Sequence, residues 1–188
     1  MRTLSAMLAI IGLACVNSAS AQNPRLGIGT PATHDLIRGW DIDVRFDGVG
    51  LPPGRGSVID GGKIFAEQCA ACHGEKAQKP TKSFDRLAGG RGTLASSKPI
   101  QTVGSYWPYA PTIFDYVNRA MPFPAPQTLT ANEVYAAVAY LLYVNDIVPR
   151  DAVMDAHTLA KVKMPNADGF IRDARPDTAD SKCANDCK

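Results

Sequence analysis

The chain has 188 residues, and its 20 Lys and Arg nearly balance its 18 Asp and Glu, for a formal net charge of +2 at neutral pH. This balance gives no reason to expect nucleic acid or an anionic membrane surface as a partner. A hydrophobic content of 45% and a charged content of 20% are those of an ordinary globular protein. The length accommodates one domain with extensions.

Residues 1–21 have the pattern of a secretory signal peptide. Arg2 supplies a positive start, residues 4–16 are mostly apolar, and the small residues 19–21 precede a cleavage point. The apolar run is too short to span a membrane. Cys15 lies within this leader, and we assign it to the leader rather than to a lipoprotein signal. We therefore expect export to the periplasm, with four cysteines in the mature chain and a formal charge of +1.

An arm rich in Gly and Pro follows, at residues 22–56, and its composition argues against long helices. Within it, residues 39–46 alternate between apolar and polar side chains, which is typical of a half-buried extended segment. Two interpretations stay open. The arm wraps around its own domain, or it docks on a partner through Trp40 and Phe46, since aromatic residues often anchor interfaces.

The next segment contains Cys69 and Cys72 followed directly by His73, at the end of a helix that we expect to begin near Asp60 as its N-cap. This run in an exported protein predicts covalent attachment of haem c. The two thiols form thioethers with the haem vinyl groups, and the imidazole binds the iron. Gly61 and Gly62 weaken the first turn of this helix and predict the close approach of a second helix, with the C-terminal one as candidate.

Three other uses of such a motif are a redox dithiol, a structural disulfide and half of a zinc site. A redox dithiol would not need the histidine. A zinc site would need a second pair of ligands, which only Cys183 and Cys187 offer. Those two cysteines are four residues apart in an exported chain, which favours a local disulfide between them.

The glycine-rich segment 87–94 lacks the strand and helix context of a nucleotide-binding loop. Its Arg91 is a candidate partner for a haem propionate, because a guanidinium pairs well with carboxylates; a solvated surface arginine is the alternative. Tyr106 and Trp107, together with Tyr109, are candidates to line the haem pocket.

Two further helices are predicted. One covers residues 111–120, with proline in its first turn and one apolar face. The other covers about residues 131–144 and begins with a capping box of Thr130 and Glu133. Small residues on this second helix suit the crossing that the paired glycines require. A short helix is also expected within residues 151–163.

Met121, just before the last long helix, is our candidate for the second axial ligand of the iron. Prolines in residues 122–126 stiffen the loop that follows it. Met164, His34 and His157 are the alternatives, as is an open coordination position. A methionine on iron raises the reduction potential and blocks the binding of substrates, which favours electron transfer.

Residues 57–148 resemble a class I cytochrome c domain, through the haem motif and the methionine before the last helix. Four segments extend the similarity to the haem subunit of periplasmic sulfite dehydrogenases, a family that includes the cytochrome partner of sulfite:cytochrome c oxidoreductases and the haem subunit of sulfane dehydrogenase. These segments are residues 39–44, 102–110, 119–123 and 163–170.

The resemblance implies an all-α class I cytochrome c fold, with the extended arm at residues 22–56 and a C-terminal extension at residues 149–188. It implies one covalent haem c and a partner subunit with molybdopterin, in a heterodimer or heterotetramer. The chain would perform no chemistry of its own; it would accept single electrons from sulfite or sulfane oxidation and pass them to a soluble cytochrome c.

The chain departs from the family in length. The haem subunit of sulfane dehydrogenase usually carries a second cytochrome domain, whereas that of sulfite dehydrogenase is usually shorter than this chain. Two alternative functions stay open: a free-standing periplasmic shuttle to a terminal oxidase, and a haem enzyme or gas-binding protein with an open iron position.

Overall fold

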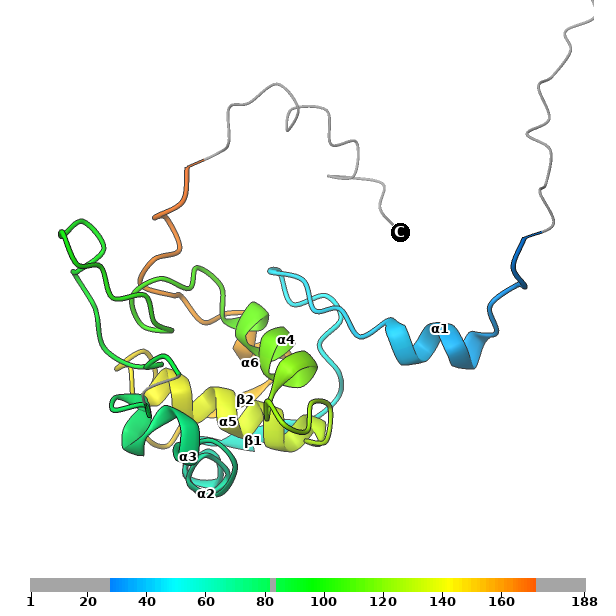
Figure 1. Cartoon of the computed structure of the whole chain (residues 1–188), viewed down its shortest axis with the longest axis horizontal. Coiled ribbons are helices and arrows are strands. Elements are labelled where there is room, and N and C mark those ends of the chain that lie inside the picture. The colour runs from blue at the N-terminus through cyan, green and yellow to red at the C-terminus, as the bar shows by residue number, and fades with distance from the viewer. Residues whose placement is uncertain (1–27, 82–83, 172–188) are drawn as a thin grey trace, which may run out of the picture. The chain divides into compact units, whose positions relative to one another are not determined.

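The computed structural model describes residues 28–81 and 84–171, and its regular secondary structure is mostly helical, as expected (Figure 1). The chain divides between Ile37 and Arg38 into two units. The helix α1 (His34–Trp40), in which no residue is buried, begins in the first unit. The other elements follow in the second unit: β1 (Arg55–Ser57), α2 (Val58–Gln68), α3 (Ala70–His73), η2 (Glu75–Ala77), α4 (Ala110–Ala120), α5 (Ala131–Tyr143), β2 (Val153–Asp155) and α6 (Ala156–Leu159).

The N-cap of α2 lies three residues earlier than predicted. Ser57 is the N-cap, because its hydroxyl accepts a hydrogen bond from the backbone N–H of Asp60 at 3.1 Å. The carboxylate of Asp60 accepts from the Ser57 hydroxyl instead, at 2.6 Å. The prediction of Asp60 as the cap was therefore wrong. Ser57 has the extended backbone conformation of an N-cap, whereas Asp60 lies inside the first turn of the helix.

The predicted crossing of α2 and α5 is confirmed. A Cβ atom on Gly61 would overlap the backbone oxygen of Ala136, and it would lie 2.9 Å from the Cβ of Tyr140. Gly62 faces the ring of Tyr140, and the ring of Phe65 packs against that ring with centroids 5.1 Å apart. The small residues on both helices thus let the two backbones approach closely.

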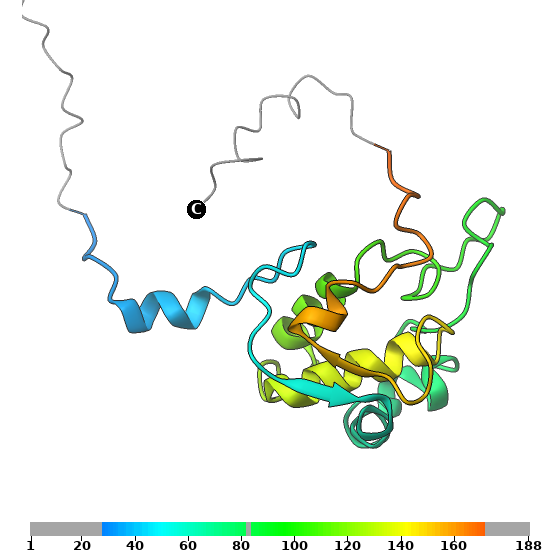
Figure 2. The same ribbon diagram turned by 180° about the vertical axis from the view of Figure 1, so that it is seen from behind.

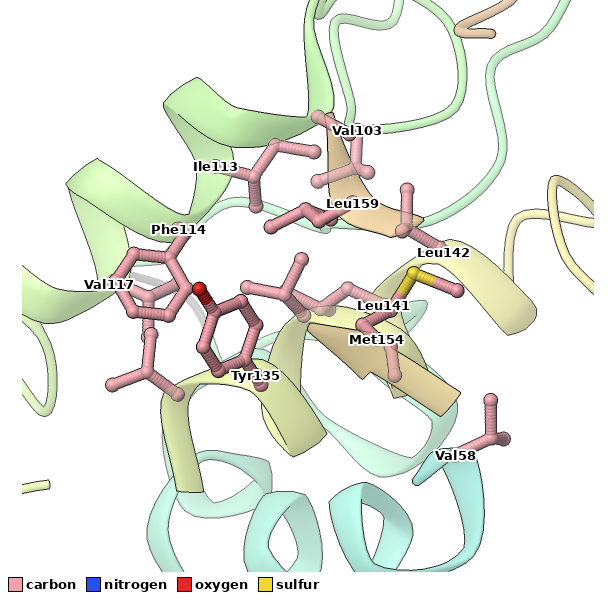
Figure 3. Close-up of a cluster of buried hydrophobic side chains, with 14 of the residues drawn as sticks. Val58, Val103, Ile113, Phe114, Val117, Tyr135, Leu141, Leu142, Met154 and Leu159 are labelled. Atoms are coloured by element: carbon pink, nitrogen blue, oxygen red, sulfur yellow. The ribbon is translucent and has the colours of Figure 1, made fainter. Parts of the chain in front are cut away.

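The core packs around α5 and takes buried side chains from α2, α4, β2 and α6 (Figure 3). Phe114 of α4 faces Tyr135 of α5 with ring centroids 4.5 Å apart, and both side chains are fully buried. The hydroxyl of Tyr135 donates to the Pro52 carbonyl at 2.8 Å. Burial raises the pKa of Tyr135 to about 12. The predicted capping box of Thr130 and Glu133 is present at the start of α5.

The chain after α5 forms the strand β2, which packs against the core. The strand β2 pairs antiparallel with β1, with Gly56 opposite Met154, and β1 leads directly into α2 (Figure 2). The expected helix within residues 151–163 is therefore reduced to the single turn of α6. Met154 and Leu159 are buried, so this segment closes one side of the core.

Part of the glycine-rich arm packs on the domain that follows it. The backbone N–H of Val44 donates to Asp115 of α4 at 2.9 Å, and Arg119 bridges Asp43 and Asp115 at 2.6 and 2.7 Å. Val44 is buried, whereas Trp40 is 80% exposed. The expected extended conformation is wrong for residues 39 and 40, which end α1. No helix among the described residues is long and apolar enough to cross a membrane.

Candidate functional site

The predicted haem motif lies on a helical turn that is offset from α2. Cys69 ends α2 in a non-helical conformation, and α3 begins directly after it. The N–H groups of Cys72 and His73 both donate to the Cys69 carbonyl, at 3.1 and 3.0 Å. The single helix expected through Cys72 is thus broken at the first cysteine, and the three motif residues share one tight turn.

His73 has one ring nitrogen engaged. Its Nδ1 lies 3.0 Å from the backbone oxygen of Asp85, and only a protonated nitrogen can donate to a carbonyl. This contact assigns a proton to Nδ1, and in the neutral imidazole it leaves Nε2 with a free lone pair, which is the form that binds iron. The ring of Phe84 contacts the imidazole edge on, with centroids 6.1 Å apart.

Among the described residues, neither motif cysteine forms a disulfide, and both are half-buried. Burial raises the pKa of Cys69 to about 11, with the neighbouring Cys72 as a smaller cause. A redox dithiol requires a lowered thiol pKa, so this environment disfavours that use of the motif. Two adjacent free thiols and an imidazole with a free Nε2 are the donor set that covalent haem attachment needs.

The segment after the motif fixes its conformation. Thr81 donates to the Cys72 carbonyl twice, from its N–H at 3.0 Å and from its hydroxyl at 3.3 Å. Gly74 has a φ of +75°, and a Cβ there would overlap the backbone of Lys79. Glycine is therefore required directly after His73, because any side chain would push the chain away from the motif.

Met121 is the C-cap of α4 and is partly buried against the same core that Cys69 borders. Met164 differs, since it is only 2% exposed and belongs to the core itself. His157 lies on the surface with its Nε2 2.6 Å from Lys161, and His34 is exposed in α1. Of these four candidates for the second axial ligand, Met121 alone combines a position at the core margin with partial exposure.

Arg91 reaches the end of α5. Its Nη2 donates to the backbone oxygen of Asn145 at 2.7 Å, and both residues line a pocket of about 160 Å³ together with Gln78 and Gly104. The guanidinium is thus held by one hydrogen bond and keeps further donors for a carboxylate. Its role toward a haem propionate stays a prediction.

The two aromatic candidates have different surroundings. Trp107 is partly buried against the core and contacts Tyr116 edge on, with centroids 5.8 Å apart. Tyr106 is 38% exposed, and its ring contacts Phe170 of the C-terminal extension at 5.3 Å. Tyr109 is paired with Phe46 of the arm at 5.2 Å. Trp107 therefore contacts the core, whereas Tyr109 contacts the arm and Tyr106 the C-terminal extension, and the role of Trp107 in a haem pocket stays a prediction.

Two contributors to this site were missed in the sequence. The Asp85 carbonyl that orients His73 is a backbone group, for which no residue type gives a signal. Asn145 holds the segment that follows Asp85, and its only sequence signal was a polar residue at a position on the apolar face of the last helix. The described residues include no cluster of three or more His, Cys, Asp or Glu that could hold a metal ion.

The predicted signal peptide at residues 1–21 and the predicted disulfide between Cys183 and Cys187 lie outside the described residues. The same holds for the end of the C-terminal extension.

Comparisons with known proteins agree with this site. The family model "Cytochrome c" matches residues 58–145, which include the haem motif and all of α2 to α5. No curated protein sequence matches the chain. A chain in the crystal structure of the sulfane dehydrogenase SoxCD from Paracoccus pantotrophus is 43% identical, with a TM-score of 0.75, over 87% of this chain and 83% of that chain. The chain therefore belongs to the cytochrome c family, resembles the haem subunit of sulfane dehydrogenase, and carries covalently bound haem c.

Proposed function

We propose that this chain is the electron-accepting haem subunit of a periplasmic, molybdenum-containing sulfane dehydrogenase. It passes electrons one at a time to a soluble cytochrome c. The observation that carries the proposal is the 43% identity with a chain of SoxCD over most of both chains. Similarity that extends over 87% of this chain reaches well beyond the cytochrome domain, which a shared haem fold alone would not require.

The roles of the residues follow from the site. Cys69 and Cys72 would hold haem through thioether bonds, and Nε2 of His73 and the thioether of Met121 would bind its iron. Haem c supplies, when bound, an iron centre that exchanges single electrons. With His73 and Met121 both bound to the iron, the protein would exclude substrates from it, as electron transfer requires and chemistry at the metal does not.

Arg91 is proposed to stabilise a haem propionate. Its guanidinium is anchored on the carbonyl of Asn145 and lines a pocket, so its position is fixed before any carboxylate arrives. A pre-positioned guanidinium loses little conformational entropy when it pairs with an anion. Trp107 is proposed to line the haem pocket from the core side.

The decisive experiment mixes the purified haem-loaded protein with its molybdenum subunit and follows haem reduction by absorption after adding a sulfane substrate or sulfite. We expect reduction with the sulfane substrate and only in the presence of the molybdenum subunit. Reduction by sulfite alone would move the assignment to sulfite dehydrogenase. A haem that ascorbate reduces but neither substrate does would favour a free-standing shuttle. Carbon monoxide binding to the reduced wild-type protein would favour an open iron position.

A further inference from the structure

Asn145 lies just beyond α5 and is only 5% exposed. Its side chain amide donates to the carbonyls of Leu87 at 3.1 Å and Leu141 at 2.8 Å, which uses both of its N–H groups. Its side-chain oxygen accepts from the N–H of Gly89 at 3.1 Å. The carboxamide therefore ties the end of α5 to the segment of residues 87–89.

The backbone of Asn145 also binds this segment, and its side chain fills the space next to Gly104. The backbone oxygen of Asn145 accepts from Arg91 at 2.7 Å. A Cβ atom on Gly104 would overlap the side-chain oxygen of Asn145, so Gly104 leaves the room that the carboxamide occupies. Three of the four hydrogen bonds of Asn145 thus end on residues 87–91.

The segment that Asn145 holds is continuous with the group that orients His73. Asp85, whose carbonyl lies 3.0 Å from Nδ1 of His73, stands two residues before Leu87. On the opposite side, the N–H groups of Leu87 and Ala88 donate to the carbonyl of Ala77 at 2.8 and 3.0 Å. Ala77 itself lies just after the haem motif, so the segment is fixed between the motif and the end of α5.

We propose that Asn145 is a positioning residue for His73: by fixing residues 87–91 it sets the Asp85 carbonyl against Nδ1 of the imidazole. The hydrogen bond from Nδ1 increases the electron donation of Nε2 and favours the oxidised state of the bound iron. Asn145 thereby lowers the reduction potential although none of its hydrogen bonds reaches the imidazole. The inference rests on the proposed function in one respect, the ligation of iron by His73.

The test compares haem-loaded Asn145→Ala with Asn132→Ala in the full mature chain. Asn132 is the matched control, because its side-chain oxygen accepts from the N–H of Arg55 at 2.8 Å and joins the other end of α5 to β1. Three quantities are measured: the denaturation midpoint, the reduction potential, and the hydrogen exchange of the His73 Nδ1–H by NMR of the reduced protein.

Both variants are expected to lower the denaturation midpoint. Only Asn145→Ala is expected to raise the reduction potential and to speed the exchange of the Nδ1–H about ten-fold, the loss expected when one hydrogen bond weakens. An unchanged potential and unchanged exchange in Asn145→Ala would overturn the proposal and leave Asn145 a purely structural residue. Equal shifts in Asn132→Ala would overturn it as well.

If Asn145→Ala does not fold, Asn145→Gln carries the test under the same criteria, because it keeps the amide and displaces it by one methylene. The wild-type spectrum distinguishes a failure of this inference from a failure of the proposed function. If wild type and variants all show haem-shifted ring signals of His73, but Asn145→Ala changes neither the potential nor the exchange, only this inference is contradicted. Absence of such signals from wild type contradicts both the inference and the ligation by His73 in the proposed function.

Discussion

Gly61 of α2 and Ala136 of α5 meet so closely that no side chain fits between them, since a Cβ on Gly61 would overlap the Ala136 backbone oxygen. Because the Ala136 oxygen belongs to the backbone and not to a flexible side chain, the two helices would have to separate to admit a Cβ atom. We expect Gly61→Ala to destabilise the protein by about 3 kcal/mol through overpacking. Denaturant unfolding of the haem-loaded protein measures this loss.

The neighbouring glycine provides the matched control. A Cβ on Gly62 would lie 3.4 Å from the Tyr140 ring, which is ordinary van der Waals contact. Gly62→Ala is therefore expected to be neutral or to stabilise by up to about 1 kcal/mol through helix propensity. Equal losses of stability in both variants would show that the glycines are needed for their backbone conformation and not for the close crossing of α2 and α5.

Asp115 is expected to hold the arm on the domain. Its carboxylate accepts from the N–H of buried Val44 and from Arg119, which also reaches Asp43. Asp115→Ala leaves the Val44 N–H unpaired and should cost about 2 kcal/mol, with faster proteolysis at residues 41–47. Arg45→Ala removes an exposed ion pair with Asp47 and should cost less than about 1 kcal/mol. Proteolysis at the wild-type rate in Asp115→Ala would contradict this role.

The two candidate methionines can be separated by the same substitution. Met121→Leu should open the iron of the reduced protein to carbon monoxide and lower the reduction potential, because it removes a thioether at the core margin. Met164→Leu conserves volume in the core and should cost less than about 1.5 kcal/mol, with an unchanged potential. Carbon monoxide binding in Met164→Leu alone would assign the ligand to Met164 instead.

The capping box of α5 should make stability depend on acid pH. Hydrogen bonds from the backbone and then the hydroxyl of Thr130 lower the pKa of Glu133 below its ordinary value of 4.5. The carboxylate therefore stabilises the fold fully above the unfolded pKa, and this contribution is lost as pH falls through the folded pKa. The stability difference between wild type and Glu133→Gln should be constant near neutrality and change only below about pH 4.5.

Thermal unfolding from pH 7 down to pH 3 measures this dependence. Glu67→Gln, at an exposed position of α2, controls for the removal of one negative charge. If the stability of Glu133→Gln and of wild type fell equally as the pH was lowered, the capping carboxylate would not contribute to acid sensitivity.

The elements with local signals could be predicted from the sequence. The haem motif, the capping box of Thr130 and Glu133, and the proline at the start of α4 each specify a turn of helix through neighbouring residues. Gly61 and Gly62 even predicted the crossing with α5, because two glycines in one turn require a packing reason. The axial role of Met121 and the propionate role of Arg91 stay predictions from the same source.

The contacts that join distant segments of the chain became apparent only in the folded structure. The three-residue strands β1 and β2 are too short to give a period-two pattern, so their pairing follows from burial of Met154 and not from a sequence signal. The carbonyl of Asp85 and the carboxamide of Asn145 contribute through hydrogen bonds to backbone groups, and such groups are the same in every residue. The orientation of His73 therefore depends on where the folded chain places two backbone segments, which residue identity alone cannot specify.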